Sequence, residues 1–266
     1  MIRDIDWAKA ARNFKDAAPF NYVVIDNFFN PEVADKLSSE FPDPRSEVMN
    51  TYKNPLEDKL TLNQWDKFPN CTYRAFTALA KESFVKKMQD LIDDPLFNFD
   101  GNTQLVMDYG LNGGGWHMHG RGGNNNIHLD YNIHPKLGWQ RKLNIIIYLS
   151  KDWDTSWGGG LELWSHDYET NKPLELVKTV ENIFNRAIIF DTTQNSWHGL
   201  PNSINCPDGV YRKSMAAYYV TPAPAQTEQR GRALFVARED QKDDASVQDL
   251  ILKRASVTQS ADVYRK

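Results

Sequence analysis

The chain has 266 residues, 41% of them hydrophobic, and a formal net charge of −4. This size and composition predict one sizeable domain with its own core, and the lack of a basic run gives nucleic-acid binding no electrostatic support. The 2 cysteines are too few for a disulfide framework, the N-terminus lacks an apolar signal core, and no apolar run approaches the roughly 20 residues of a membrane helix. We therefore expect a soluble, cytoplasmic protein that binds neither nucleic acid nor membrane.

The first third of the chain predicts helices around a single strand. Residues 4–17 have the apolar spacing of an amphipathic helix, and residues 22–29 are rich in β-branched and aromatic side chains, which is typical of a strand. A second helix is predicted over residues 31–41, with an Asn cap before it and Pro at its first position. Residues 44–72 are polar and predict an irregular loop over the site, and residues 74–93 predict another helix.

The middle of the chain predicts short strands with turn signals between them, a pattern typical of a sandwich or jelly roll. The Gly- and Asn-rich segment 113–126 predicts a loop. Strands are expected at residues 104–109, 127–131, 144–150, 161–164, 177–180, 186–190 and 214–220.

The end of the chain is strongly charged. Residues 244–254 predict a short helix with Ser246 as its cap. We expect one domain over residues 1–266, with a core at about 20–222 and a charged C-terminal extension at 223–266. The extension is expected to form a solvated helix that packs on the domain.

A metal centre is predicted on the strand that contains His128 and Asp130. Two residues apart on a strand, their side chains point to the same face, and His198 is the best third ligand from elsewhere in the chain. Two imidazoles and one carboxylate form the facial triad that leaves open positions on a non-haem Fe(II). With two neutral imidazoles, a divalent ion keeps one net positive charge, which favours an anionic chelator.

Such a chelator needs a buried basic residue at its far end. Arg212 follows His198 by 14 residues (212 − 198), and its guanidinium can hold a carboxylate with two parallel hydrogen bonds. Ser214 lies two residues further on, on the same face, and can donate its hydroxyl hydrogen to that carboxylate.

The order His128-x-Asp130, His198, Arg212-x-Ser214 resembles that of the Fe(II)- and 2-oxoglutarate-dependent dioxygenases, and more closely their prolyl-4-hydroxylase-like branch. The likeness covers roughly residues 20–222. Its further motifs are the strand entry Val24 to Phe29, the run Tyr148 to Trp153, and Gly159-Gly160-Leu161.

The resemblance implies a mainly β fold with flanking helices, the double-stranded β-helix or jelly roll. It implies a 2-oxoglutarate-dependent dioxygenase with Fe(II) bound by the catalytic residues His128, Asp130 and His198, with O2 as co-substrate and ascorbate as an optional reductant. The reaction would hydroxylate an unactivated C–H bond of an amino acid, a peptidyl proline or another small polar metabolite, and release succinate and CO2. Related halogenases carry Gly or Ala in place of Asp130, so the sequence argues against halogenation.

The same resemblance assigns roles around the metal. Arg212 and Tyr148 would hold the distal carboxylate of 2-oxoglutarate, with Ser214 as the serine of an RxS motif. Tyr109, on the preceding predicted strand, would line the co-substrate pocket, although the segment before the metal strand is longer than in prolyl hydroxylases. The candidate substrate contacts are His119, Arg121, Asn126 and Tyr131; an ordered polar loop is the alternative for Arg121 and Asn126.

Two other classes of protein stay open. One is a catalytically silent jelly roll that binds a metal or ligand. The other is a cupin-type isomerase with zinc or nickel, for which His117-x-His119 would suit as ligands, but which would not need Arg212 and Tyr148. The expected partner is a small-molecule or peptide substrate, and an oligomer is compatible with the sequence.

Overall fold

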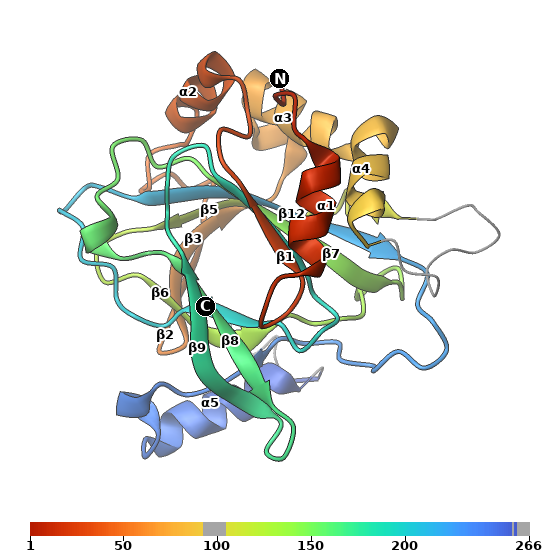
Figure 1. The fold of residues 1–266 in the computed structure, drawn as a ribbon. Coiled ribbons are helices and arrows are strands. Elements are labelled where there is room, and N and C mark those ends of the chain that lie inside the picture. The colour runs from red at the N-terminus through yellow and green to blue at the C-terminus, as the bar shows by residue number, and fades with distance from the viewer. Residues whose placement is uncertain (93–104, 257, 260–266) are drawn as a thin grey trace.

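A single antiparallel sheet, rolled almost into a closed barrel, forms the centre of the molecule (Figure 1). The computed structural model describes residues 1–92, 105–256 and 258–259. The strands are β1 (Tyr22–Ile25), β2 (Asn50–Asn54), β3 (Glu57–Leu62), β4 (Val106–Met107), β5 (Gly115–His119), β6 (Asn124–Leu129), β7 (Gln140–Tyr148), β8 (Leu161–Asp167), β9 (Lys172–Val180), β10 (Ala187–Asp191), β11 (Trp197–Leu200), β12 (Arg212–Thr221) and β13 (Leu234–Phe235).

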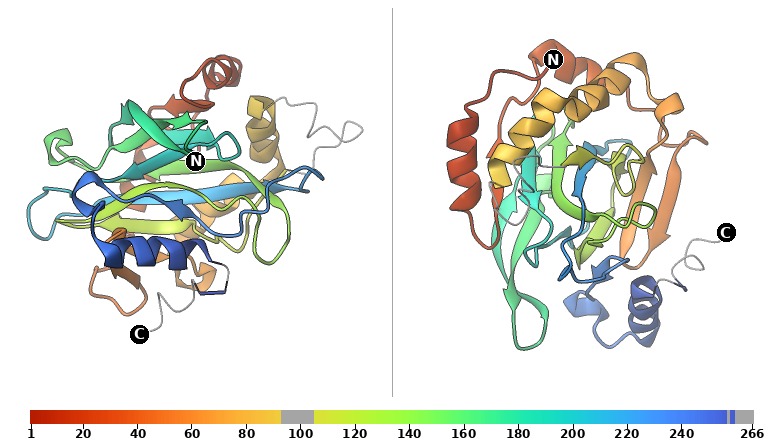
Figure 2. Two further views of the ribbon diagram at one scale, coloured as in Figure 1. Left: turned by 90° about the horizontal axis from the view of Figure 1, so that it is seen from below. Right: turned by 90° about the vertical axis from the view of Figure 1, so that its right-hand side faces the viewer.

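Neighbouring strands follow the order β1-β10-β7-β12-β5-β3-β6-β11-β8-β9, with β2, β4 and β13 added at β3, β12 and β6. The right-hand view of Figure 2 shows these strands as a ring around an interior. The predicted mainly β fold, a double-stranded β-helix with flanking helices, is confirmed.

Helices cover the outside of the sheet. They are α1 (Trp7–Lys15), α2 (Pro31–Ser39), α3 (Asn70–Ala80), α4 (Glu82–Ile92) and α5 (Ala245–Ala255). Figure 1 shows α2 and α3 at the end of the molecule opposite α5. Phe84 of α4 contacts Trp7 of α1 edge-on, with ring centroids 5.6 Å apart, and lies 6.5 Å from Tyr219 of β12. None of the helices in the described ranges is long and apolar enough to cross a bilayer.

The strands β7 and β12 are buried on both faces because both faces are covered. On the outer face, Ile145, Ile147 and Met215 belong to the large core shared with the helices. On the inner face, Tyr148 and Phe190 belong to a smaller cluster that fills part of the barrel. Strands that are buried on both sides contain nearly continuous hydrophobic runs, as residues 145–148 of β7 and 215–220 of β12 do.

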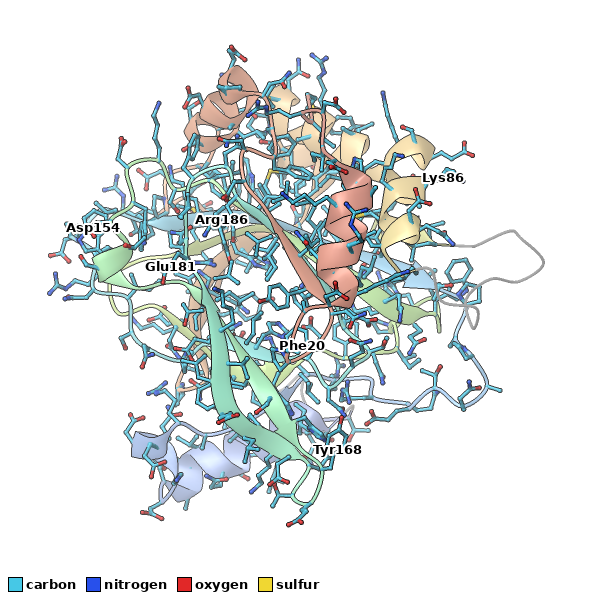
Figure 3. The ribbon with its side chains drawn as sticks, viewed as in Figure 1. Phe20, Lys86, Asp154, Tyr168, Glu181 and Arg186 are labelled. Carbon is cyan, nitrogen blue, oxygen red and sulfur yellow. The ribbon has the colours of Figure 1, made fainter. Side chains whose placement is uncertain are left out.

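The smaller cluster lies beside the β8–β9 hairpin, which contributes Leu161, Leu163 and Val180 to it. It includes Phe20, which Figure 3 labels near the middle of the molecule. The β8–β9 hairpin extends beyond it, and Figure 3 labels Tyr168 at the hairpin tip. That side chain is 86% exposed.

Two segments that were predicted as loops contain strands, and these predictions were wrong. Segment 44–72 supplies β2 and β3, and segment 113–126 supplies β5 and the start of β6. β5 pairs with β12 on one edge and with β3 on the other. Backbone hydrogen bonds from two neighbours thus outweigh the low strand propensity of Gly and Asn, because propensity depends on context in sheets.

Helix boundaries also differ from the prediction. The helix expected over residues 74–93 is two helices, α3 and α4, separated by the extended residue Lys81; residue 93 lies outside the described residues, as does residue 104 of the strand expected at 104–109. Asp244, rather than Ser246, caps α5 by accepting from the backbone N–H groups of Ser246 and Val247.

The C-terminal extension contributes more than a solvated helix. Its strand β13 pairs with β6, with Leu234 opposite Leu129 and Phe235 opposite His128. The extension therefore lies directly against the strand that was predicted to bind the metal.

Candidate active site

Three potential metal ligands meet on two adjacent strands. His128 on β6 and His198 on β11 are direct register partners, and Asp130 follows the last residue of β6. The Nε2 atom of His128 lies 3.8 Å from Oδ1 of Asp130, and Nε2 of His198 lies 3.9 Å from Oδ2. One ligand atom from each residue lies within 4.8 Å of the others, and all three residues are buried.

Backbone carbonyls fix the two imidazole rings. Nδ1 of His128 donates to the carbonyl oxygen of Asn126 at 2.8 Å, and Nδ1 of His198 donates to that of Ser196 at 2.7 Å. Because a carbonyl can only accept, each ring carries its proton on Nδ1 and keeps the Nε2 lone pair for a metal. Bonds of this kind orient metal-binding histidines and set their tautomer.

The charge states also suit a divalent ion. Burial, with the neighbouring His198, lowers the pKa of His128 to about 3, so this ring is neutral at pH 7. Burial alone would raise the pKa of Asp130, but His198 and Arg141 overcome that effect and the pKa is lowered. Metal ligation requires neutral imidazole and ionised carboxylate, and the site provides both without a change in protonation of these two residues.

Tyr218 of β12 holds the carboxylate ligand. Its hydroxyl donates to Oδ2 of Asp130 at 2.9 Å. The guanidinium of Arg141 lies over the rings of Tyr218 and Tyr131, 3.6 and 3.3 Å from their centroids, and donates to the Tyr131 hydroxyl. This stack connects β7 to the metal ligand through Tyr218.

A buried cation lies on the same inner face of the barrel. Arg212, 2% exposed, donates from Nε to the carbonyl oxygen of Gly159 at 2.7 Å and contacts the Ser214 hydroxyl at 3.4 Å. Its guanidinium carbon lies 5.0 Å from the centroid of the Tyr148 ring. Burial lowers the pKa of Arg212, and no acidic side chain in the described part of the chain pairs with it. An Arg side chain nevertheless stays charged at neutral pH.

The glycine run before β8 makes room for this cation. Gly159 has a φ of +78°, and a Cβ atom built there would lie 3.1 Å from Cδ of Arg212. Glycine is therefore required both by the backbone conformation and by the close approach of the arginine.

The hydroxyl of Tyr148 makes no hydrogen bond of good geometry to a described residue, although the residue is fully buried and its hydroxyl interacts with the Arg212 guanidinium. Tyr148 and Ser214 are register partners on β7 and β12. A buried cation without an acid and a buried hydroxyl without a good hydrogen bond are both unfavourable unless a ligand satisfies them. The arrangement can hold a carboxylate between Arg212, Tyr148 and Ser214.

Two of the predicted substrate residues lie in or beside this interior. His119 is the register partner of Arg212 and is 3% exposed. Neither of its ring nitrogens has a partner within the described ranges, and burial lowers its pKa well below the usual value. Tyr131 packs against Arg141, and burial raises the pKa of its hydroxyl to about 12.

The structure does not bring the other predicted residues to the site. Arg121 has a 57% exposed side chain, 4.0 Å from Asp208. The Asn126 side chain turns toward the C-terminal extension. Tyr109 is 61% exposed and packs beside Trp65, in the turn after β4. The strand that borders the site next to Arg212 and Ser214 is β5. The resemblance had placed Tyr109 on that bordering strand, but Tyr109 lies outside it.

Residues that the sequence analysis did not single out also line the interior. Tyr218 shares strand parity with Arg212 and Ser214, so an i, i+2 count along β12 could have found it. Thr61 of β3 is opposite His117 of β5, and Lys59 follows the same face. Segment 44–72 lacks a clear alternation of polar and apolar residues, so its sequence did not predict strand β3.

Comparison with known proteins supports the same reading. Residues 114–220 match the family model of the 2OG-Fe(II) oxygenase superfamily. No curated protein sequence matches the chain. Among solved structures, the fold is similar to that of a prolyl hydroxylase from Trichoplax adhaerens in complex with a hypoxia inducible factor peptide fragment, with 15% identity over 81% of this chain and 89% of that chain and a TM-score of 0.55.

Two further structures are similar. A prolyl-4-hydroxylase from Pseudomonas putida is 14% identical over 80% of this chain and 99% of that chain, with a TM-score of 0.51. The non-heme alpha ketoglutarate dependent epimerase SnoN from nogalamycin biosynthesis is 13% identical over 87% of this chain and 83% of that chain, with a TM-score of 0.53. At these identities the structural likeness establishes the fold. The matched segment confirms the predicted resemblance to the 2OG-Fe(II) oxygenase superfamily, and the fold is shared with structures that include prolyl hydroxylases.

Proposed function

We propose that this protein is an Fe(II)- and 2-oxoglutarate-dependent dioxygenase that hydroxylates an unactivated C–H bond. The observation that carries the proposal is the His128–Asp130–His198 cluster, within 4.8 Å, in a barrel whose inner face also contains the buried Arg212, which pairs with no acidic side chain of the described ranges. A zinc or nickel isomerase would not need that arginine. A silent binding protein would have no need of both features together.

The donor set fits Fe(II). Two imidazoles and one carboxylate leave coordination positions for a co-substrate and O2. When bound, Fe(II) would activate O2, which is the oxidant: two electrons would come from 2-oxoglutarate, released as succinate and CO2, and two from the C–H bond that is hydroxylated. His128, Asp130 and His198 would hold the ion, and Tyr218 would keep the Asp130 carboxylate oriented through its 2.9 Å hydrogen bond.

Arg212, Tyr148 and Ser214 fit the distal carboxylate of 2-oxoglutarate. Arg212 would pair with it, while the hydroxyls of Tyr148 and Ser214 would donate to its oxygens. Exclusion of water strengthens each of these bonds, because a buried site has a low local dielectric.

The remaining inner face favours a small polar substrate or an exposed peptidyl residue. His117 and His119 lie side by side on one face of β5, and burial with the cations Lys59 and Arg212 lowers the pKa of His117 to about 3. Neutral imidazoles donate one hydrogen bond and accept one. Such groups can orient a substrate that carries hydroxyl or amide groups, including an amino acid or a peptidyl proline.

Anaerobic titration of the Fe(II)-loaded protein with 2-oxoglutarate tests the proposal. We expect the weak visible charge-transfer band of an Fe(II)–2-oxoglutarate chelate, and its loss in Arg212→Ala at the same 2-oxoglutarate concentration while iron stays bound. No band with iron bound would overturn the oxygenase assignment. Substrates are then screened by succinate release, and product mass distinguishes the outcomes: an added oxygen supports hydroxylation, and an unchanged mass contradicts it.

A further inference from the structure

We propose that the C-terminal segment 230–256 is an integral part of the metal centre and that Phe235 is a positioning residue for His128. The inference rests on the proposed metal-binding function and extends it to a part of the chain outside the matched family segment. Four sets of contacts along this segment support it.

The first set is strand pairing at the edge of β6. One edge of β6 pairs with β11, where His198 lies opposite His128. On the other edge, β3 pairs with Asn124 and Asn125 at the start of the strand. β13 pairs with the end of the strand, at His128 and Leu129. The C-terminal segment therefore supplies the second strand neighbour of the metal-ligand end of β6.

The second contact is made by the side chain of Phe235. Its ring stacks on the His128 ring, with centroids 4.9 Å apart and planes inclined by 22°, and the residue is 4% exposed. The hydrogen bond to the Asn126 carbonyl fixes one end of the imidazole, and the phenyl face restricts rotation about it. Together they hold Nε2 toward Asp130.

The third set joins the segment to residues next to the ligands. The Asn126 side chain accepts from Arg238 at 2.9 Å and donates to Gln241 at 2.8 Å. The carbonyl oxygen of the same asparagine binds His128. Arg230 donates from Nε to the carbonyl oxygen of Asp130 at 3.0 Å. Backbone next to two of the three metal ligands is thus held by the extension.

The fourth set of contacts joins α5 to strand β3 of the barrel. Arg254 of α5 donates to Oε1 of Glu57 at 3.0 Å, and Lys59 lies 2.8 Å from Oε2 of the same carboxylate. The Arg254 guanidinium also lies 5.1 Å from the Phe235 ring centroid. Both the arginine and the glutamate side chains are largely buried, so this ion pair fixes α5 to β3.

The consequence is a reciprocal coupling between the segment and the metal. If docking of β13 positions His128, the docked state binds metal more tightly. Metal must then favour the docked state by the same factor, because coupling between two equilibria is reciprocal. Metal affinity and protection of the segment from proteolysis should change together.

Titration of the full-length protein with Co(II), whose visible spectrum reports ligand geometry, tests this. We expect Phe235→Ala to weaken Co(II) binding by about 10- to 100-fold, the range for groups that orient metal ligands, and to alter the Co(II) spectrum. Phe235→Tyr keeps the ring and should restore both. Leu252→Ala, at a 71% exposed position of α5, is the matched control and should bind like the wild type.

Limited trypsin digestion supplies the reciprocal measurement. Co(II) should slow cleavage within residues 230–256 in the wild type and should not do so in His128→Ala. Arg238→Ala, a milder change at a partly exposed side chain, replaces Phe235→Ala if that variant does not fold, and should weaken Co(II) binding by about 10-fold.

Wild-type Co(II) affinity and spectrum in the folded variant would overturn the positioning role. Failure of the wild type itself to bind Co(II) or Fe(II) would instead overturn the proposed function.

Discussion

The metal cluster (His128, Asp130 and His198) and the anion group (Arg212, Tyr148 and Ser214) are two halves of one barrel interior. They differ in how many of their polar groups already have hydrogen-bond partners in the protein. Each histidine ligand has its Nδ1 atom on a backbone carbonyl, and Asp130 accepts from Tyr218. In the anion half, Arg212 pairs with no acidic side chain of the described ranges, and the Tyr148 hydroxyl makes no hydrogen bond of good geometry there. The metal half is therefore preorganised, whereas the anion half would be completed by a bound carboxylate.

This contrast predicts different costs in the two halves. Preorganised ligands bind an ion without reordering side chains. Unsatisfied buried groups lower the stability of the empty protein and return that free energy when a carboxylate enters. Substitutions in the metal half should therefore affect metal binding, and those in the anion half should affect 2-oxoglutarate binding and the stability of the empty protein.

The largest expected effect is in Asp130→Ala. Loss of the carboxylate leaves two imidazoles, so Fe(II) affinity measured by anaerobic titration should fall by more than about 100-fold, beyond the range for outer groups. Asp208→Ala, at a side chain that is 92% exposed, is the matched control. Tight iron binding by Asp130→Ala would contradict the assignment of Asp130 as a metal ligand.

Arg212→Met tests whether the halves are independent. The affinity for 2-oxoglutarate should fall by about 30-fold or more, since removal of one partner of a buried charge pair costs about 2–5 kcal/mol. Fe(II) binding should stay within about threefold of wild type, and the empty protein should be equally or more stable, because an unpaired buried charge is gone. Calorimetric unfolding checks the last point, and a large fall in stability would contradict it.

Two matched tyrosine substitutions sharpen the comparison. Tyr218→Phe removes a satisfied hydroxyl and should weaken Fe(II) binding by about 10-fold. Tyr148→Phe removes a hydroxyl that lacks a good hydrogen bond and should stabilise the empty protein by about 1 kcal/mol while weakening 2-oxoglutarate binding by about 10-fold. Thermal unfolding and ligand titration measure both. The reverse pattern would mean that the two halves are assigned the wrong way round.

The smallest expected effect is on the pH dependence of the metal-free protein. The pKa of His128 is about 3 in the folded state, because of burial and His198, against an ordinary value of 6.5. The unfolded chain therefore binds the extra proton first as the pH falls, so the stability from neutral His128 is complete above about pH 6.5 and declines toward pH 3. Thermal unfolding midpoints should fall between about pH 7 and about pH 4.5. His128→Gln should show a shallower decline, and an identical one would contradict this.

The metal cluster and Arg212 could be predicted from the sequence because paired residues of the site are spaced by the two-residue period of a strand. His128 and Asp130 are separated by one strand period, and Arg212 and Ser214 by another. Tyr218 obeys the same parity on β12. Tyr109 does not reach the interior, because the Gly-rich segment forms β5 and takes the position expected for the strand of Tyr109.

Other parts of the site could not be predicted because they arise from long-range pairing. Lys59 faces the interior only because β3 is held between β2, β5 and β6. Phe235 lies in a short apolar run, residues 233–237 of a charged region, and that run does not by itself identify β6 as the partner strand. In both cases tertiary pairing outweighs local propensity.

The pairing of Phe235 with His128 also bears on biosynthesis. The two residues are 107 positions apart (235 − 128), and translation proceeds at about 5–20 residues per second. Phe235 follows the second histidine, His198, by 37 positions (235 − 198), so for about 2–7 seconds a growing chain has both histidines but lacks the strand that pairs beside His128. Such distant pairing is also slow to form. The nascent barrel is thus completed late, and β6 has an unpaired edge beside His128 until β13 has been synthesised.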